Sequence, residues 1–236
     1  MAGPVGSDAA RNGEMRGRLI TFEGGEGTGK STHAGLLVER LNGLGIAVVR
    51  TREPGGSPGA EAIRHVLLSG AAKPLGAEAE AILFAAARDD HVRNTIEPAL
   101  ASGAWVICDR FIDSTRVYQG MLGRVDLKLI RALERATVGD LKPDLTFVLD
   151  VPADVGLARA HKRRGADATD RFEAESLAFH EELRDAYRQV VLHEPERCVL
   201  VDATQTKAEV AERIWKAMNE RLHPATAPVA LEGAAL

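Results

Sequence analysis

The strongest constraint on the fold is an alternation of five short apolar runs with longer segments of helical periodicity. The runs are rich in β-branched residues, and their continuous apolarity is typical of strands buried on both faces of a parallel sheet. Strands and helices that alternate in this way predict a doubly wound α/β sheet with right-handed crossovers and helices on both faces. The five expected strands are Leu19–Phe22, Ala47–Arg50, Trp105–Asp109, Leu145–Asp150 and Cys198–Asp202.

Apolar periodicity also places helices between and after these runs. The last helix is expected to begin at a capping box, because Thr206 is followed three residues later by Glu209. A longer helical segment in the middle of the chain carries an apolar stripe that is typical of an amphipathic helix. This stripe consists of Ile82, Ala86, Val92, Ile96 and Leu100.

The chain has 236 residues, which suits one α/β domain with modest extensions better than two full domains. A chain of this length can bury enough surface to fold without a metal or a disulfide. We expect a single domain over residues 17–223. Residues 1–16 and 224–236 are small, polar or rich in proline and alanine, and we expect both segments to be disordered tails.

Charge and cysteine content narrow the class of protein. The formal net charge is −4, which argues against the broad basic face used in nonspecific nucleic-acid binding. Cys108 and Cys198 each lie in an apolar run and are expected to be buried free thiols in a reducing compartment. The chain shows neither a run long enough to span a membrane nor the apolar stretch of a signal peptide. The sequence therefore predicts a cytoplasmic protein that binds neither nucleic acid nor membrane.

Directly after the first expected strand, residues 24–31 read GGEGTGKS and match the phosphate-binding pattern GxxxxGK[ST]. Glycines let the backbone curl so that its N–H groups point at phosphate oxygens, and the following helix adds the positive end of its dipole. Lys30 is expected to reach the β- and γ-phosphates and to be exposed in the empty enzyme, while Ser31 is placed to ligate Mg²⁺. The predicted ATP-binding residues are Gly24, Gly25, Glu26, Gly27, Thr28, Gly29, Lys30, Ser31 and Thr32.

A phosphate-binding loop does not identify the reaction, because GTPase switches, motor ATPases and small-molecule kinases all contain one. The sequence lacks an NKxD-type guanine-reading motif, a DxxG switch after the third expected strand and an LSGGQ-like signature. Three other segments favour a kinase.

The first segment is Asp109-Arg110, at the carboxyl end of an expected strand, where ligands gather in open α/β sheets. Asp109 is positioned to hold the Mg²⁺ shell and Arg110 to clamp a second phosphate group; a strand-end salt bridge is the alternative. The second, TREPGG, brings Arg52 to the same edge, although alone it is only a charged turn. The third, at about 161–171, is basic and contains a glycine. It is either a solvated charge run or a mobile lid that brings guanidinium groups to the phosphates.

With these features in order, the chain resembles the thymidylate kinases, which make dTDP from dTMP and ATP. The resemblance extends from about Leu19 to Leu222 and implies a P-loop fold, a five-stranded parallel sheet, Mg²⁺ with ATP as the phosphate donor, and a homodimer. Six segments in the family's order carry it: FEGGEGTGKST (22–32), TREPGG (51–56), ILFAAARDDHV (82–92), DRFIDSTRVYQG (109–120), PDLTFVLDVP (143–152) and DRFEAES (170–176).

The resemblance also implies which residues bind the nucleoside of dTMP. Phe84 matches the aromatic residue that stacks on thymine, and Arg88, four residues on, would hydrogen-bond the base edge. Thr115 falls where the family places a small polar side chain against the pyrimidine. Tyr118 matches the residue that crowds the 2′ position of the sugar and so favours deoxyribose. Glu26 matches the carboxylate that approaches the 3′-hydroxyl.

By the same resemblance, Arg52 and Arg110 are ligands of the acceptor phosphate. Some family members carry a catalytic arginine inside the P-loop, but the variable positions of this loop hold no basic residue. Charge that develops on the transferring phosphoryl group must then be met by the lid, as in the bacterial type with an arginine-rich lid. Arg164 is the first choice for this role, with Arg163 and Arg171 behind it. The expected catalytic residues are Lys30, Arg110 and Arg164.

Two other functions stay open at this point. One is another P-loop kinase that acts on a different nucleotide or on a deoxynucleoside; two arginines aimed at an acceptor phosphate favour a monophosphate instead. The other is a nucleotide-dependent switch that signals through a partner, and the missing guanine-reading motif counts against it.

Overall fold

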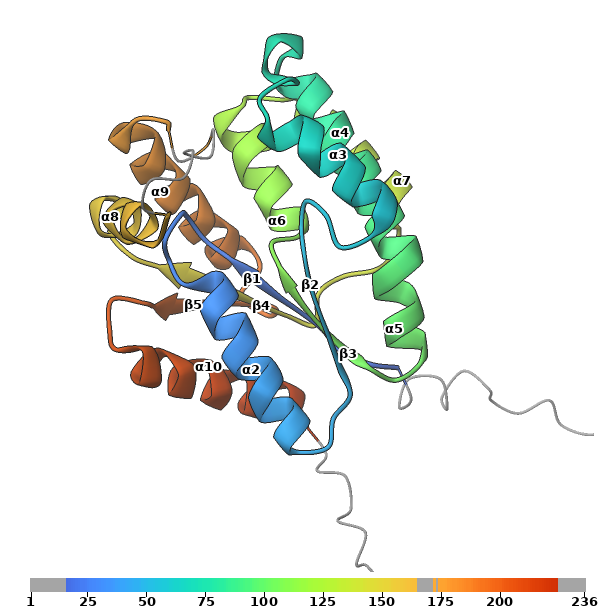
Figure 1. Cartoon of the computed structure of the whole chain (residues 1–236), viewed down its shortest axis with the longest axis vertical. Helices are drawn as coiled ribbons and strands as arrows, with labels where there is room; N and C mark the ends of the chain where they lie inside the picture. Colours follow the sequence, from blue (N-terminus) through green and yellow to red (C-terminus); the bar gives the residue numbers. More distant parts are fainter. Residues whose placement is uncertain (1–15, 165–171, 173, 225–236) are drawn as a thin grey trace, which may run out of the picture.

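The computed structural model describes residues 16–164, 172 and 174–224. Within these residues, five parallel strands form one sheet in the order β2-β3-β1-β4-β5. Each strand is followed by at least one helix before the next begins, as is usual for crossover connections between parallel strands (Figure 1). The strands are β1 (Leu19–Glu23), β2 (Val48–Arg52), β3 (Trp105–Asp109), β4 (Leu145–Asp150) and β5 (Cys198–Asp202).

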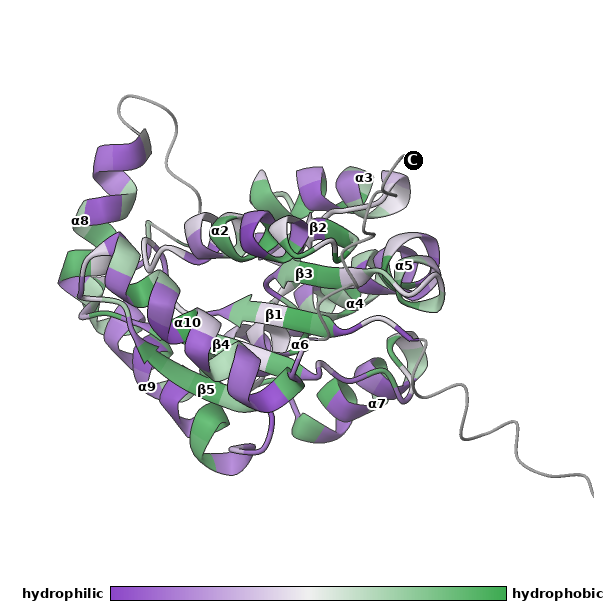
Figure 2. Cartoon of the chain, turned by 90° about the horizontal axis from the view of Figure 1, so that it is seen from below, coloured by the Kyte–Doolittle hydropathy of each residue, from purple (hydrophilic) through white to green (hydrophobic). Residues whose placement is uncertain are grey.

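Helices cover both faces of the sheet (Figure 1). On one face α2 (Lys30–Gly43) and α10 (Lys207–Leu222) pack against the strands through a fully apolar cluster that includes Leu37, Ile107 and Ile214. On the other face, one cluster joins β3 to the helical segment after α4, and another joins β4 to α9. Figure 2 shows largely hydrophobic strands between helices that also carry hydrophilic residues.

The remaining helical elements form the second face and surround the carboxyl edge of the sheet. They are α3 (Pro58–Leu68), η1 (Lys73–Leu75), α4 (Ala77–His91), η2 (Val92–Ile96), α5 (Glu97–Ala101), α6 (Ile112–Thr115), η3 (Arg116–Leu122), α7 (Leu127–Thr137), α8 (Ala153–Arg164) and α9 (Leu177–His193).

The predicted fold class is confirmed, and the strand predictions agree closely with the structure. Three strands have the predicted bounds, β1 is one residue longer, and β2 begins one residue later and ends two residues later than expected. Burial on both faces holds for the central strands but is wrong for β2 and β5. These two strands form the edges of the sheet, so parts of each remain accessible to solvent.

The predicted apolar stripe is buried only in part. Val92, Ile96 and Leu100 are buried against β3, but Ile82 and Ala86 in α4 are exposed. The segment is continuous helix that changes to π-helical pairing at η2. A π-helical turn needs more residues than an α-helical turn, which rotates the buried face between α4 and α5. One stripe at a constant period therefore cannot describe both.

Several smaller predictions can be compared with the structure. The capping box is present, because the Thr206 side chain accepts from the Glu209 backbone N–H and the Glu209 side chain accepts from the Thr206 backbone N–H. Cys108 and Cys198 are buried free thiols. No helix in the described ranges is both long and apolar enough to span a membrane. Apart from residues 16 and 224, both predicted tails lie outside the described residues, as do positions 165–171 of the predicted lid.

Candidate active site

The polar residues predicted to carry the chemistry follow three neighbouring strands at one edge of the sheet. The loop at 24–29 follows β1, Arg52 ends β2 and Asp109 ends β3. The parallel register pairs Asp109 with Phe22 of β1 on one side and with Arg52 of β2 on the other. Since parallel strands end together, the fold brings these segments to one place at the carboxyl edge.

The phosphate-binding loop requires glycine for two separate reasons. Gly24 and Gly27 have φ angles of 128° and 66°, a region that favours glycine. In addition, a Cβ atom at Gly27 would lie only 1.9 Å from the carbonyl oxygen of Gly156 in α8. The loop therefore packs directly on the backbone of α8, the helix that leads into the predicted lid.

Lys30 is the first residue of α2 and is buried, so the expectation that it is exposed is wrong. Its Nζ donates to the carbonyl oxygens of Gly24 (3.0 Å) and Gly25 (2.6 Å), which folds the side chain back over the loop. Burial, together with the charge of Arg110, lowers the pKa of Lys30 to about 8. An anion in the loop would raise this pKa, because it adds a negative charge beside the ammonium group and offsets the repulsion by Arg110.

The expected Mg²⁺ ligands lie side by side. The Ser31 hydroxyl donates to the Asp109 carboxylate across the gap between α2 and β3. No cluster of three or more metal-ligating side chains occurs among the described residues. Two oxygen ligands fit Mg²⁺ well, because this ion usually keeps several waters and takes other oxygens from substrate phosphates. The donor set is therefore compatible with Mg²⁺ bound together with a nucleoside triphosphate.

A cavity of about 310 Å³ opens beside the loop, within the size range of small-ligand sites. It lies among the phosphate loop, the ends of β2 and β3, α4 and η3. Gly24, Gly25 and Thr28 line a small second cavity of about 20 Å³ instead. The other predicted site residues that line the main cavity are Glu26, Gly27, Gly29, Lys30, Ser31, Thr32, Arg52, Phe84, Arg88, Asp109, Arg110, Thr115, Tyr118 and Arg163.

Arg110 lies between the phosphate loop and the cavity. Its φ angle of 70° is unusual for a residue with a side chain and is the kind of backbone feature that clusters at functional sites. Its Nη2 donates to Glu26 Oε1 at 2.5 Å, and its Nη1 donates to the Gly24 carbonyl oxygen at 3.2 Å. Burial opposes ionisation of Glu26, but the charges of Arg110 and Lys30 outweigh it and lower the pKa of this carboxyl to about 2.

Arg52 reaches the same cavity from β2. Its Nη2 donates to Glu61 Oε1 at 2.9 Å, and about half of its side chain is exposed. Arg110 and Arg52 both line the cavity, and each is paired with one carboxylate. A phosphate group that binds there meets two guanidinium groups, which suit its oxygens better than an ammonium group does.

Arg88 of α4 lines the cavity and is almost completely buried. Its Nε donates to Glu53 Oε2 (2.8 Å), and its Nη2 donates to Thr115 Oγ1 (3.0 Å) and the Phe111 carbonyl oxygen (3.1 Å). Phe84, one helical turn earlier, also lines the cavity. The predicted base-binding residues Phe84, Arg88 and Thr115 therefore come together in the structure.

Glu53 holds Arg88 in place, and the sequence alone predicted no role for it. The Glu53 carboxylate pairs with Arg88 and also lies 3.1 Å from His91 Nδ1, while His91 Nε2 is 2.6 Å from Thr51 Oγ1. Glu53, Arg88 and His91 are buried, and Thr51 is partly buried. The motif TREPGG contains Glu53, but nothing in its local pattern shows that it pairs with a helix 35 positions further along.

Tyr118 of η3 also lines the cavity. Its hydroxyl donates to Glu26 Oε1 at 3.3 Å, and the guanidinium carbon of Arg110 is 5.3 Å from its ring centre. Its ring also meets that of Phe172 edge-on, with 5.1 Å between their centres. Glu26 and Tyr118, the residues expected near the sugar, are therefore in contact.

The predicted lid arginines can be followed only in part. Arg163 lines the cavity, and Arg164 is the last residue of α8. The side chain of Arg164 and the whole of Arg171 lie outside the described residues. The cavity lining also includes residues that sequence analysis did not select, namely Glu53, Pro54, Arg64, Leu68, Phe111, Ser114, Gln119 and Phe172.

A phosphate-binding loop beside a cavity that is lined by two arginines defines a P-loop kinase acting on a small phosphorylated acceptor. The thymidylate kinase family model matches residues 22–214. The chain is 63% identical over 214 residues to a thymidylate kinase of Afipia carboxidovorans, covering 91% of this chain and 94% of the relative. It is 61% identical over 212 residues to a thymidylate kinase of Rhodopseudomonas palustris, covering 89% and 92%.

A solved structure of thymidylate kinase from Ehrlichia chaffeensis is similar in fold, with a TM-score of 0.68 and 33% sequence identity. It matches 86% of this chain and 99% of its own length. The chain belongs to the thymidylate kinase family and is a kinase of nucleotide biosynthesis.

Proposed function

We propose that the chain transfers the γ-phosphoryl group of ATP to dTMP, with ATP on the loop at 24–32 and dTMP in the 310 Å³ cavity. One observation carries this proposal: a single cavity beside the phosphate loop is lined by two arginines that suit a phosphate, Arg52 and Arg110, and by a ring and a buried guanidinium group of α4 that suit a base, Phe84 and Arg88. A nucleoside monophosphate fits this arrangement because its phosphate points toward the donor while its base lies away from it.

The loop and the two arginines bring the reacting groups together. Lys30 turns from the loop carbonyls to the β- and γ-phosphates when ATP binds, and Arg110 leaves part of its pairing with Glu26 to hold the acceptor phosphate. No general base is needed, since the acceptor oxygen already carries negative charge at neutral pH. Positioning and electrostatic stabilisation supply the rate, as in other phosphoryl transfers.

Ser31 and Asp109 are the residues that would hold Mg²⁺. The ion, when bound with ATP, neutralises charge on the phosphate oxygens. The Ser31–Asp109 hydrogen bond supports this assignment, because it keeps both oxygens at the entrance of the loop.

Specificity for the nucleoside comes from α4 and η3. Phe84 stacks on the thymine ring, while Arg88 and Thr115 hydrogen-bond its edge. Tyr118 excludes a 2′-hydroxyl, and Glu26 accepts from the 3′-hydroxyl. The Tyr118–Glu26 contact supports this division of roles, because two groups that approach neighbouring positions of one sugar must lie close together.

The segment at about 161–171 acts as the lid, and Arg164 meets the charge that develops on the transferring phosphoryl group. Two observations support a basic group from this side: Arg163 lines the cavity, and α8 packs directly on the phosphate loop at Gly27. Arginine is the suitable residue because it can bind two oxygens at once.

The functional unit is one domain over residues 17–223, and it forms a homodimer in the cytoplasm. Exposed apolar side chains on the neighbouring helices α3 and α4, Val66 and Ile82, support a surface that a second copy covers. The two buried free thiols support a reducing compartment.

A coupled assay of ADP formation with dTMP, dUMP, dCMP and thymidine tests the proposal. We expect dTMP to give the highest kcat/KM and thymidine to give none above the ATPase background. Higher activity with dCMP or thymidine would instead identify another nucleotide kinase or a deoxynucleoside kinase. ADP formation that is independent of every acceptor would contradict a kinase.

A further inference from the structure

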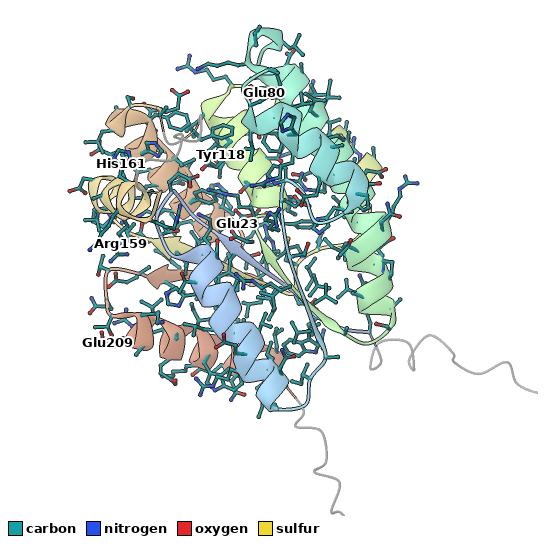
Figure 3. All side chains as sticks on the ribbon, in the orientation of Figure 1. Glu23, Glu80, Tyr118, Arg159, His161 and Glu209 are labelled. Carbon is teal, nitrogen blue, oxygen red and sulfur yellow. The ribbon has the colours of Figure 1, made fainter. Side chains whose placement is uncertain are left out.

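Glu23 is a fully buried carboxylate that the mechanism above does not use. It is the last residue of β1, immediately before the phosphate loop, and none of its surface is exposed. Figure 3 shows it in the interior of the molecule, below Tyr118 in that view. A buried carboxylate is costly unless it is paired or hydrogen-bonded, so its surroundings show what it does.

Two of its hydrogen bonds come from the start of the helical segment formed by α6 and η3. The backbone N–H of Phe111 donates to Glu23 Oε1 at 2.8 Å, and that of Ser114 donates to the same oxygen at 3.3 Å. These N–H groups lie where a helix leaves its first donors unpaired. Glu23, at the end of β1, therefore caps the start of the helical segment that carries Thr115 and Tyr118.

Two hydroxyl groups donate to the other oxygen. Ser114 Oγ lies 2.7 Å and Tyr187 Oη 3.1 Å from Glu23 Oε2. Each hydroxyl has one proton, and an ionised carboxylate takes both. Each hydroxyl oxygen must then turn its lone pairs elsewhere.

Both hydroxyl oxygens face Arg110. Its Nη1 donates to Tyr187 Oη at 3.2 Å and to Ser114 Oγ at 3.4 Å. Ser114 Oγ also lies 2.9 Å from Tyr187 Oη. When both hydroxyls donate to the ionised carboxylate, their oxygens are left to accept from the guanidinium group, and the four groups form one hydrogen-bonded network. Tyr187 comes from α9 and is almost completely buried, so its ring is held by packing as well.

Burial and the nearby Asp113 raise the pKa of Glu23 to about 7, whereas Ser114, Arg110 and the Phe111 N–H favour its charged form. A glutamine would fill the same space without that desolvation cost. Glutamine would also present an NH₂ group, which cannot accept from a hydroxyl. Above about pH 7, where Glu23 is ionised, the acceptor-only character of a carboxylate is therefore the property that this position uses.

We propose that Glu23 is a positioning residue for acceptor binding: acting through the hydroxyls of Ser114 and Tyr187, it holds Arg110 ready for the phosphate of the acceptor. The inference rests on the proposed function, in which Arg110 binds the phosphate of dTMP. Glu23 does not touch substrate; it acts on Arg110.

The main test is Tyr187→Phe, which removes one hydroxyl and keeps the ring in the core. We expect kcat/KM for dTMP to fall roughly ten- to hundredfold, the effect of one lost hydrogen bond to a charged group. The KM for ATP should stay near that of the wild type. Thymidine lacks the phosphate, so its inhibition constant against dTMP should also stay unchanged. A general distortion of the site would change all three quantities, whereas a smaller folded fraction would lower kcat and leave the KM for dTMP unchanged.

A second test places the same change in an Arg110→Lys background. If Tyr187 acts through Arg110, Tyr187→Phe has little further effect there, because lysine has no Nη1 for the hydroxyl to orient. Glu23→Gln should repeat the pattern with a larger loss, and Ser114→Ala with a smaller one. The matched control is Thr115→Val, which removes a hydroxyl from the same cavity that bonds Arg88 rather than Arg110; its loss should persist in the Arg110→Lys background.

The inference is overturned if Tyr187→Phe changes the KM for ATP or thymidine inhibition as much as kcat/KM for dTMP. It is also overturned if its effect is fully retained with Arg110→Lys, or if Glu23→Gln has wild-type kinetics. A wild-type chain that does not phosphorylate dTMP would contradict the proposed function instead, so the two failures are distinguishable.

Discussion

Replacing Arg88 by lysine separates the charge of this residue from its geometry. Arg88 donates through Nε to Glu53 and through Nη2 to Thr115 and the Phe111 carbonyl oxygen. A lysine ammonium is a single point that cannot reach these partners and a base together. We expect it to stay with Glu53, since breaking a buried pair leaves a carboxylate without its partner. The base then loses its hydrogen bond.

The size of the effect follows from the bonds that are lost. A hydrogen bond to a charged group is worth about 1.5–3 kcal/mol, so kcat/KM for dTMP should fall roughly ten- to hundredfold. Loss of the Thr115 and Phe111 contacts should also lower the free energy of unfolding by about 1–3 kcal/mol. The KM for ATP should stay near the wild-type value, because the phosphate loop is not in contact with Arg88.

Initial rates with one substrate saturating and the other varied measure these quantities, and urea denaturation measures the stability. Arg93→Lys is the matched control: it changes the same residue type at an exposed position that pairs only with Asp89 among the contacts of the described residues. We expect it to leave all parameters nearly unchanged. The reasoning is refuted if Arg88→Lys keeps wild-type kcat/KM for dTMP, or if the KM values of ATP and dTMP rise together.

Three further predictions follow from the site. Tyr118→Ala should let ribothymidylate compete better with dTMP by about 1–3 kcal/mol, because a cavity replaces the side chain expected beside the 2′ carbon; unchanged discrimination in a competition assay would contradict this. Arg164→Ala should lower kcat by roughly 10³-fold with little change in either KM, since the charge it meets exists only in the transition state; a higher KM for ATP with kcat within a few fold of wild type would show that Arg164 only grips ATP. Glu26→Gln should destabilise the protein in a pH-dependent way. The pKa of Glu26 is lowered from 4.5 to about 2 in the folded state, so its ionisation contributes about 3 kcal/mol at pH 7 and only about 1 kcal/mol at pH 3. The wild-type protein therefore loses this contribution as pH falls from about 4.5 toward 2. The difference in the free energy of unfolding between the wild type and Glu26→Gln, measured by denaturation, should shrink from pH 7 to pH 3; a constant difference would contradict the ion pair.

The sequence predicts the fold well because its signals are local. Each strand is a short apolar run, and the loop at 24–31 requires glycines at set spacings between a strand and a helix. The rule that parallel strands end together then brings Arg52, Asp109 and the loop to one edge. The errors arise where tertiary context decides: β2 and β5 lie at the edges of the sheet, and η2 rotates the buried face of the helix that contains Ile82.

The site was predictable only where a residue belongs to a compact motif. Glu23 and Tyr187 meet across 164 positions of sequence, and Glu53 and Arg88 across 35. No periodicity or spacing shows such pairs, because they depend on how separate elements pack. Lys30 was expected in solvent because lysine is rarely buried, but the loop carbonyls supply acceptors that make its burial possible.

The most direct test of the account is a crystal structure of the protein with dTMP and a non-hydrolysable ATP analogue. The account predicts the thymine ring on Phe84 with its edge at Arg88, the dTMP phosphate on Arg52 and Arg110, and the phosphates of the analogue in the loop at 24–32. A dTMP molecule bound in the opposite direction, with its base at Arg110 and its phosphate at Arg88, would contradict it.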